Sequence, residues 1–196
     1  MEGPTRVLFA ENDDSFSWNV VECLPVPRES VRLVPGRLLA GHPGDLRGAD
    51  VLVIGPGPTD PVRAGLVGLV EAANRAGVPV LGICLGHQAL GLRFGARLVR
   101  VPPVHGHVTP VAFGPSRWFP GCEGVHPAMR YHSLALADVP PPLRVVATTA
   151  DGIPMAIEHP ARPLAGLQFH PDSHGTPGGR AIVAAFFRAA LSGGAP

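Results

Sequence analysis

A cysteine framed by glycines follows a short apolar run and has the setting of a nucleophile. The run 80–83 leads into Cys84, with Gly82 two residues before it and Gly86 two residues after it. Small residues at these positions let a strand and a helix pack closely around a sharp turn, as in the Gly-x-Ser-x-Gly elbow of hydrolases. The dipole of the helix favours a thiolate there, and the backbone N–H of Leu85 faces an oxyanion. The pattern predicts acyl transfer on sulfur; the alternative is a small buried core residue.

A histidine and a carboxylate end a second apolar run. Residues 167–172 read Leu-Gln-Phe-His-Pro-Asp, so Pro171 separates His170 from Asp172. A nucleophilic cysteine needs an imidazole to accept its proton, and the imidazole needs an acceptor on its other nitrogen. We therefore expect His170 to be the base and Asp172 its orienting acid. A histidine satisfied by solvent at a strand end is the alternative, and the presence of Cys84 favours the catalytic interpretation.

With these segments in place, the chain resembles the class I glutamine amidotransferases. The segments that carry the resemblance are 82–88 (Gly-Ile-Cys-Leu-Gly-His-Gln), 55–58 (Gly-Pro-Gly-Pro), 131–134 (Tyr-His-Ser-Leu), 12–16 (Asn-Asp-Asp-Ser-Phe) and 105–106 (His-Gly). The last two are similar to segments in the glutaminase subunits of anthranilate synthase and aminodeoxychorismate synthase. The GMP synthetase and carbamoyl phosphate synthetase branches fit less well, because the sequence shows no second catalytic domain and segment 12–16 suits neither.

The resemblance implies a glutaminase that works with a partner. Cys84 would attack the side-chain amide of L-glutamine, and His170 would protonate the departing ammonia before water hydrolyses the thioester. The N–H groups of Leu85 and Gly57 would hold the oxyanion. The substrate-binding set extends to Pro58, Thr59, Gln88, Ser133 and Leu134. Because ammonia is mostly protonated at neutral pH, it should pass within a complex to a chorismate-binding synthase subunit.

Departures from the family pattern affect both the site and its surroundings. Asp172 stands where relatives carry glutamate, so we expect its carboxylate to fall about 1 Å short of the imidazole. Thr59 stands where a second glycine is expected and adds a Cβ near the oxyanion loop. Asp13 and His107 replace an aromatic residue and a lysine in segments associated with partner docking, which indicates an atypical partner.

Other functions compete with an active amidotransferase. A noncatalytic docking subunit would keep the fold, but the retention of Cys84, His170 and Gln88 together disfavours it. A hydrolase of γ-glutamyl peptides would need no partner. A metal site at His170, Asp172 and His174 is disfavoured because Pro171 breaks the helix that would align them, so we expect neither metal nor cofactor. His105 and His107 are expected to be surface or loop residues.

Length, composition and charge narrow the kinds of protein that this chain can be. The chain has 196 residues, 45% of them hydrophobic, which suits a single glutaminase domain over residues 1–196. A formal charge of +1 provides no excess of positive charge that would indicate nucleic-acid binding. We expect no signal peptide and no membrane association, because no apolar run is long enough to span a bilayer. The odd, widely spaced set of Cys23, Cys84 and Cys122 favours a reducing compartment, and so a cytoplasmic protein.

The elements that must position these residues alternate between strand and helix patterns. Strands are predicted at 7–10, 30–34, 51–54, 80–83, 144–149, 155–158 and 164–169, helices at 15–24, 62–74 and 180–191, and hairpins with long loops between 98 and 142. This order predicts an α/β fold, an open, mostly parallel twisted sheet flanked by helices, flavodoxin-like, with a smaller antiparallel portion in the C-terminal half. In such sheets ligands bind beyond the carboxyl ends of strands, where Gly57, Cys84 and His170 should meet.

Overall fold

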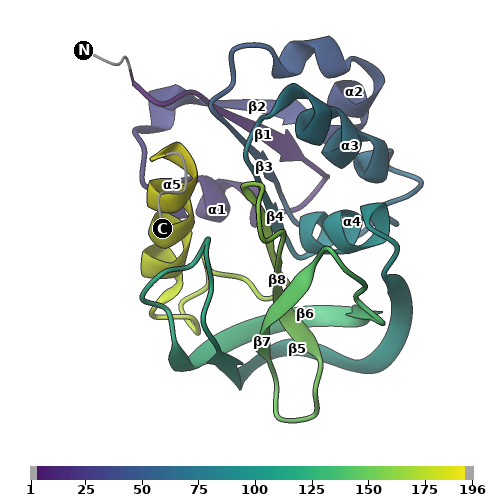
Figure 1. Cartoon of the computed structure of the whole chain (residues 1–196), viewed down its shortest axis with the longest axis vertical. Coiled ribbons are helices and arrows are strands. Elements are labelled where there is room, and N and C mark those ends of the chain that lie inside the picture. Colours follow the sequence, from purple (N-terminus) through teal and green to yellow (C-terminus); the bar gives the residue numbers. More distant parts are fainter. Residues whose placement is uncertain (1–3, 193–196) are drawn as a thin grey trace.

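Uninterrupted apolar runs become the central strands of one mixed sheet in the computed structural model, which describes residues 4–192 (Figure 1). Within that range the strand order is β2-β1-β3-β4-β9-β8-β7-β5-β6. The strands are β1 Val7–Glu11, β2 Val31–Pro35, β3 Val51–Ile54, β4 Val80–Ile83, β5 Arg97–Phe113, β6 Gly124–Ala137, β7 Arg144–Thr148, β8 Pro154–Glu158 and β9 Leu164–Leu167. The helices are α1 Ser17–Cys23, α2 Gly36–Gly41, α3 Leu66–Ala76, α4 Leu85–Arg93 and α5 Gly179–Leu191, with 3₁₀ turns at Arg28–Ser30 and Pro43–Leu46.

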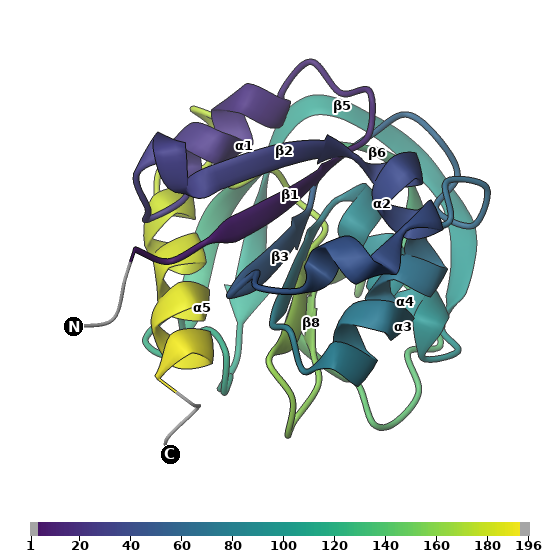
Figure 2. The ribbon, with the colours of Figure 1, turned by 90° about the horizontal axis from the view of Figure 1, so that it is seen from above.

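Alternating side chains of the parallel strands divide the core into two layers. In β1, Val7 and Phe9 pack in the cluster that contains α1 and α5, whereas Leu8 and Ala10 pack in the cluster that contains α3 and α4. Figure 2 shows α1 and α5 on one side of the sheet and α2, α3 and α4 on the other. Because both faces are covered, these strands carry apolar residues at nearly every position, as expected for a buried parallel sheet.

The register of the parallel strands brings their carboxyl ends to one edge. Strands β2, β1, β3, β4 and β9 run parallel, with Ile54 opposite Gly82 and Gly82 opposite Gly166. The loops that follow β3, β4 and β9 therefore leave the sheet side by side. Strands β8, β7, β5 and β6 continue the sheet in antiparallel pairs. The predicted α/β architecture, with its antiparallel C-terminal portion, is confirmed.

The segment between 98 and 142 is more regular than the sequence prediction. It forms a long hairpin of β5 and β6, which curves beneath the parallel strands (Figure 1), in place of several hairpins and long loops. Prolines suggested loops because proline cannot donate to a strand ladder. The structure accommodates Pro102 and Pro103 where the β5–β6 register is interrupted between Arg100 and Val104. The bulges there also bend the strands.

Helix boundaries differ from the prediction for local reasons. The helix expected from residue 62 begins at Leu66, because the Asp60 carboxylate accepts hydrogen bonds from Val62 and Arg63 N–H and forms a turn. Gly65 then adopts a left-handed conformation with φ 72°. Helix α2 was not predicted, since its six residues show no apolar period. No helix within the described residues has the length and apolarity needed to cross a bilayer.

Candidate active site

Cys84 lies at a strained turn between β4 and α4. Its φ and ψ are 51° and −96°, a region that residues with a Cβ rarely occupy. Its N–H donates to the Leu167 carbonyl at 2.8 Å, and its carbonyl accepts from Gln88 N–H at 3.1 Å. Hydrogen bonds to the end of β9 and to α4 therefore keep Cys84 in this strained conformation. Leu85, the first residue of α4, has an N–H without an acceptor inside the helix.

The glycines around Cys84 are required by close packing. A Cβ on Gly82 would lie 2.4 Å from the carbonyl group of Gly86. A Cβ on Gly86 would lie 2.3 Å from the carbonyl oxygen of Ile54 in β3. The first distance shows that β4 and the start of α4 lie too close together for a side chain at residue 82. The second shows that α4 lies directly against β3 at residue 86. Both glycines thus fix the direction in which Cys84 leaves the sheet.

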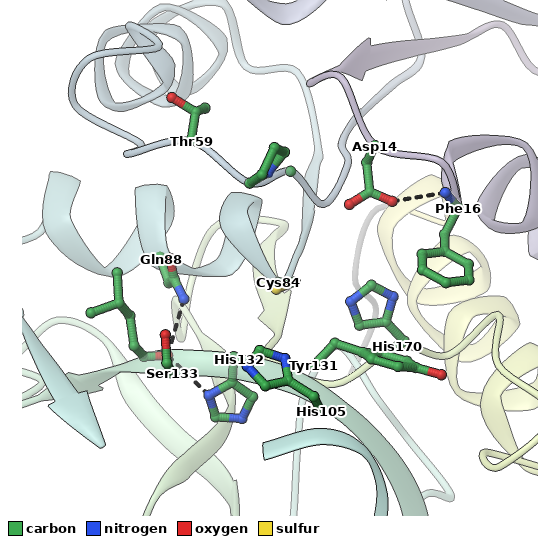
Figure 3. A pocket seen from close by; sticks show the side chains of 13 residues that line it. Asp14, Phe16, Thr59, Cys84, Gln88, His105, Tyr131, His132, Ser133 and His170 are labelled. Atoms are coloured by element: carbon green, nitrogen blue, oxygen red, sulfur yellow. Dashed lines mark hydrogen bonds between the residues drawn. The ribbon is translucent and has the colours of Figure 1, made fainter. Parts of the chain in front are cut away.

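The Cys84 sulfur faces a pocket of about 320 Å³. Figure 3 shows side chains from the β3 loop, α4, β6 and the loop after β9 around this pocket. The sequence-predicted residues that line it are Gly57, Pro58, Thr59, Cys84, Gln88, Ser133, Leu134 and His170. Leu85 and Asp172 do not line it: Leu85 is buried beneath the elbow, and Asp172 lies behind His170. Pocket residues that the sequence analysis did not predict for the site are Asp14, Phe16, His105, Tyr131 and His132.

His170 is held by backbone hydrogen bonds and by aromatic rings. Its N–H donates to the Met129 carbonyl at 3.0 Å, and its carbonyl accepts from the Thr176 hydroxyl at 2.8 Å. The ring of Tyr131 meets the imidazole edge-on, with centroids 5.0 Å apart. Phe16 stacks on Tyr131 at 5.5 Å and also contacts the imidazole edge-on at 6.0 Å. These contacts restrict the imidazole to one orientation on the pocket wall.

Asp172 lies near the imidazole but beyond normal hydrogen-bond length. Its Oδ1 is 3.5 Å from His170 Nδ1, and the two side chains are 1% and 3% exposed. Neither atom has a hydrogen-bond partner among residues 4–192. A charge-assisted N–H···O bond usually spans about 2.8 Å, so the separation agrees with the expected shortfall of an aspartate at this position.

The charge on His170 is stabilised by its neighbours. Burial lowers the pKa of His170, but the Asp172 carboxylate and the Cys84 sulfur raise it more strongly, to about 10. The imidazole is therefore protonated at neutral pH. A protonated imidazole beside a sulfur is the arrangement that activates a cysteine nucleophile.

Lengthening the acid should improve its contact with the imidazole. In the Asp172→Glu variant the carboxylate gains one methylene, so we expect kcat for glutamine hydrolysis to stay equal or to rise, up to about tenfold. Asp172→Asn, which removes the charge, should lower kcat at least about tenfold and serves as the matched comparison. Steady-state glutamate release measures both. A large fall in the glutamate variant would show that the backbone around Pro171 is built for the shorter acid.

The segment 12–16 connects the sheet to the pocket. Asn12 is buried, and its Nδ2 donates to the carbonyls of Ala10 and Gly55 at 3.1 and 3.0 Å, which ties the end of β1 to the β3 loop. The Asp14 carboxylate accepts from Phe16 N–H at 2.8 Å and so fixes the ring that reaches His170. The motif thus shapes the site through backbone contacts that its sequence did not reveal.

A polar network lies under the substrate side of the pocket. Gln88 Nε2 donates to the Leu134 carbonyl at 3.2 Å, and His132 Nδ1 contacts the same carbonyl at 2.9 Å (Figure 3). His132 Nε2 accepts from Arg130 Nε at 3.0 Å, which makes Nδ1 the protonated nitrogen. Burial and the Arg130 charge lower the pKa of His132 to about 4. A neutral His132 therefore fixes the backbone of the 131–134 segment.

Two buried histidines should make the fold sensitive to acid. Burial lowers the pKa of His87 to about 3, and the pKa of His132 is about 4. Both values lie below about 6.5, that of an unfolded histidine, so unfolding takes up protons and the free energy of unfolding should fall from about pH 6.5 toward pH 4. Urea unfolding across this range measures the dependence, and His132→Gln should reduce it by about one proton. If the free energy of unfolding depends on pH in the same way in wild type and in His132→Gln, the low pKa given to His132 in the folded protein is contradicted.

Other predicted positions lie at the rim or on the surface. Thr59 is exposed and keeps a negative φ, so its Cβ does not force a left-handed backbone. His105 and His107 are exposed on β5, and His105 also lines the pocket. Asp13 is exposed with φ 58° and pairs with Arg37 at 3.7 Å. Within residues 4–192 no group of three or more His, Cys, Asp or Glu side chains is placed to hold a metal ion.

Comparisons with known proteins agree with this geometry. The family described as glutamine amidotransferase class-I matches residues 8–190. The chain is 39% identical to anthranilate synthase component 2 of Mycobacterium tuberculosis, covering 91% of this chain and 80% of that protein. It is 39% identical to aminodeoxychorismate synthase of Streptomyces griseus, covering 92% of this chain but spanning only 25% of that longer protein.

A solved structure shares the fold. The crystal structure of a Thermoplasma acidophilum protein described as part of a GMP synthase superposes with a TM-score of 0.86, covering 98% of this chain and 96% of that one. The two sequences are 24% identical. The likeness therefore concerns the arrangement of strands and helices.

Proposed function

The chain belongs to the class I glutamine amidotransferase family, and on that premise we propose that it is the glutaminase subunit of a chorismate-using synthase. It would hydrolyse L-glutamine to glutamate and ammonia and deliver the ammonia to that partner. The observation that carries the proposal is the strained Cys84, which lines the same pocket as His170. Its relatives include proteins named anthranilate synthase component 2 and aminodeoxychorismate synthase.

The proposed reaction proceeds in two halves. The Cys84 thiolate attacks the amide carbon of glutamine, and the N–H groups of Leu85 and Gly57 hold the resulting oxyanion. His170 gives its proton to the amide nitrogen, the C–N bond breaks, and ammonia leaves a thioester on sulfur. His170 then takes a proton from water, which attacks the thioester carbon. The C–S bond breaks, and glutamate and the thiolate are released, with Asp172 supporting the imidazolium in both halves.

The position of the β3 loop supports its proposed part in oxyanion binding. A Cβ on Gly57 would lie 2.6 Å from the Asn12 carbonyl oxygen and 3.0 Å from the Leu85 side chain. The loop thus packs directly against the elbow, and only glycine allows this approach. Pro58 and Thr59 continue the loop along the rim of the same pocket.

The other end of the pocket suits the amino-acid part of glutamine. Gln88 donates through Nε2 to protein acceptors. Its Oε1 is therefore left to accept a hydrogen bond from the α-ammonium group of the bound glutamine. Ser133 and Leu134 line the same pocket. We assign these three residues to substrate binding.

The setting of the site supports a partner subunit. Phe16 at the pocket and Trp18 two residues further on are 37% and 51% exposed, and a docked protein would cover them. The proposal also includes a single glutaminase domain over residues 1–196, a cytoplasmic location consistent with three unpaired cysteines, and no cofactor or nucleic acid in the reaction.

Glutamate release in the presence and absence of a chorismate-using synthase tests the proposal. We expect hydrolysis that is coupled to amination of chorismate when the partner is present. Absence of hydrolysis with the partner present would favour a docking subunit. Equal turnover of γ-glutamyl peptides without any partner would favour a stand-alone γ-glutamyl hydrolase.

A further inference from the structure

Gln168 is a fully buried polar residue to which the proposed glutaminase reaction assigns no part. It follows β9 directly and precedes His170 by two residues. Its side chain is 0% exposed, and its N–H donates to the Met155 carbonyl at 2.9 Å, which continues the pairing with β8. A buried amide with four hydrogen-bonding positions is costly unless its partners are defined.

The partners of the Gln168 side chain are two residues of the active site. Its Nε2 donates toward the Cys84 sulfur at 3.6 Å. Its Oε1 accepts from Gln88 Nε2 at 3.3 Å, and the same Gln88 nitrogen donates to the Leu134 carbonyl at 3.2 Å. Because Gln88 supplies an N–H to Oε1, the amide of Gln168 is oriented with its own N–H groups toward the sulfur.

The Cys84 sulfur requires such a donor when it is charged. Cys84 is 8% exposed, so little water is available to solvate a thiolate. A neutral amide N–H stabilises the thiolate by a hydrogen bond but does not transfer its proton to the sulfur, whereas the imidazolium of His170 can. The donor comes from β9, away from the β3 loop that is proposed to bind the oxyanion, and so leaves that position open to the substrate.

We propose that Gln168 is a further catalytic residue, which donates an N–H to the Cys84 thiolate and holds Gln88 in its substrate-binding position. The inference rests on the proposed glutaminase function. The same hydrogen bond acts in both halves of the reaction, because sulfur is the attacking thiolate in the first and the departing thiolate in the second. A structural amide would satisfy its partners without affecting the reactivity of the sulfur.

The reactivity of Cys84 toward iodoacetamide separates these roles. Gln168→Met removes both hydrogen bonds, and Gln168→Glu keeps the shape but replaces the N–H donor with a carboxylate oxygen. Alkylation is measured from about pH 5 to pH 10 and located on the Cys84 peptide by mass spectrometry. Burial raises the pKa of Cys23 to about 12 and also raises that of Cys122, so these thiols should react slowly.

We expect both variants to slow alkylation of Cys84 at pH 7 by about tenfold or more and to shift the profile toward higher pH. Glutamine hydrolysis should lose a similar factor in kcat, and Gln168→Met should also raise KM because Gln88 is released. The matched control is Thr149→Val, which removes the buried hydroxyl that accepts from Ile153 N–H at 3.0 Å in the turn between β7 and β8. It should lower stability and leave the alkylation profile unchanged.

The outcomes distinguish this inference from the proposed function. A reactive wild-type Cys84 with the same profile in both Gln168 variants would overturn the role of Gln168 alone. An unreactive wild-type Cys84 would overturn the nucleophile assignment and this inference with it. If the methionine variant does not fold, the glutamate variant, which has the same shape, carries the test.

Discussion

Replacing Cys84 with serine should lower glutamine hydrolysis at least about a thousandfold, because the proposed thioester can then no longer form. A serine hydroxyl is far less ionised than a thiol, and His170 is already protonated at neutral pH and cannot serve as its base. Glutamate release by the purified complex measures the loss. Activity that survives the serine substitution would refute the nucleophile assignment.

Two comparisons show that the loss is specific to the chemistry. Cys122→Ser changes another buried, unpaired cysteine outside the pocket and should retain hydrolysis. In the Cys84→Ser complex, ammonium salt added at alkaline pH should still support amination by the partner. Loss of that reaction as well would indicate damage to the assembly instead of the glutaminase step.

Replacing Gly86 with alanine should destabilise the fold by about 3 kcal/mol or prevent folding, because the elbow has no space for a methyl group. The added Cβ would lie 2.3 Å from the Ile54 carbonyl oxygen and 2.9 Å from the Ile54 Cβ. Relief requires α4 to move away from β3, which would displace Cys84 and Leu85. Urea unfolding measures the change in stability.

Gly68→Ala provides the matched control within helix α3. Its Cβ would meet no atom within 4 Å, and alanine favours a helix interior by about 1 kcal/mol over glycine. We expect equal or greater stability in this variant. Equal stability of Gly86→Ala and wild type would show that the elbow is less tightly packed than the structure indicates.

The sequence predicted the parts of the fold that short-range patterns determine. Strands β3 and β4 match their predicted bounds, 51–54 and 80–83, because each is a continuous apolar run closed by glycine or cysteine at a turn. The β5–β6 hairpin was underestimated, since Pro102 and Pro103 lie where the register is interrupted, whereas Pro110 and Pro127 face each other within it. Such pairing energies are set by tertiary contacts and leave little local trace.

The site shows the same division between local and long-range information. Cys84 and His170 were recognised from their own segments, and the resemblance supplied Gln88 and Ser133. Phe16 belonged to a matching motif, yet its contact with the imidazole depends on a loop that only the folded chain brings there. Gln168 stood in the segment that contains His170, but the sequence carries no sign of which side chains a buried glutamine contacts.

Mass spectrometry of the enzyme quenched during turnover detects the covalent intermediate that the proposed reaction requires. The purified protein, together with its synthase partner, is mixed with isotopically labelled glutamine, quenched in acid during turnover and digested for mass spectrometry. We expect a labelled glutamyl group on the peptide that contains Cys84, absent from the Cys84→Ser protein. Turnover of glutamine with no label on that peptide, or with label on another residue, would contradict it.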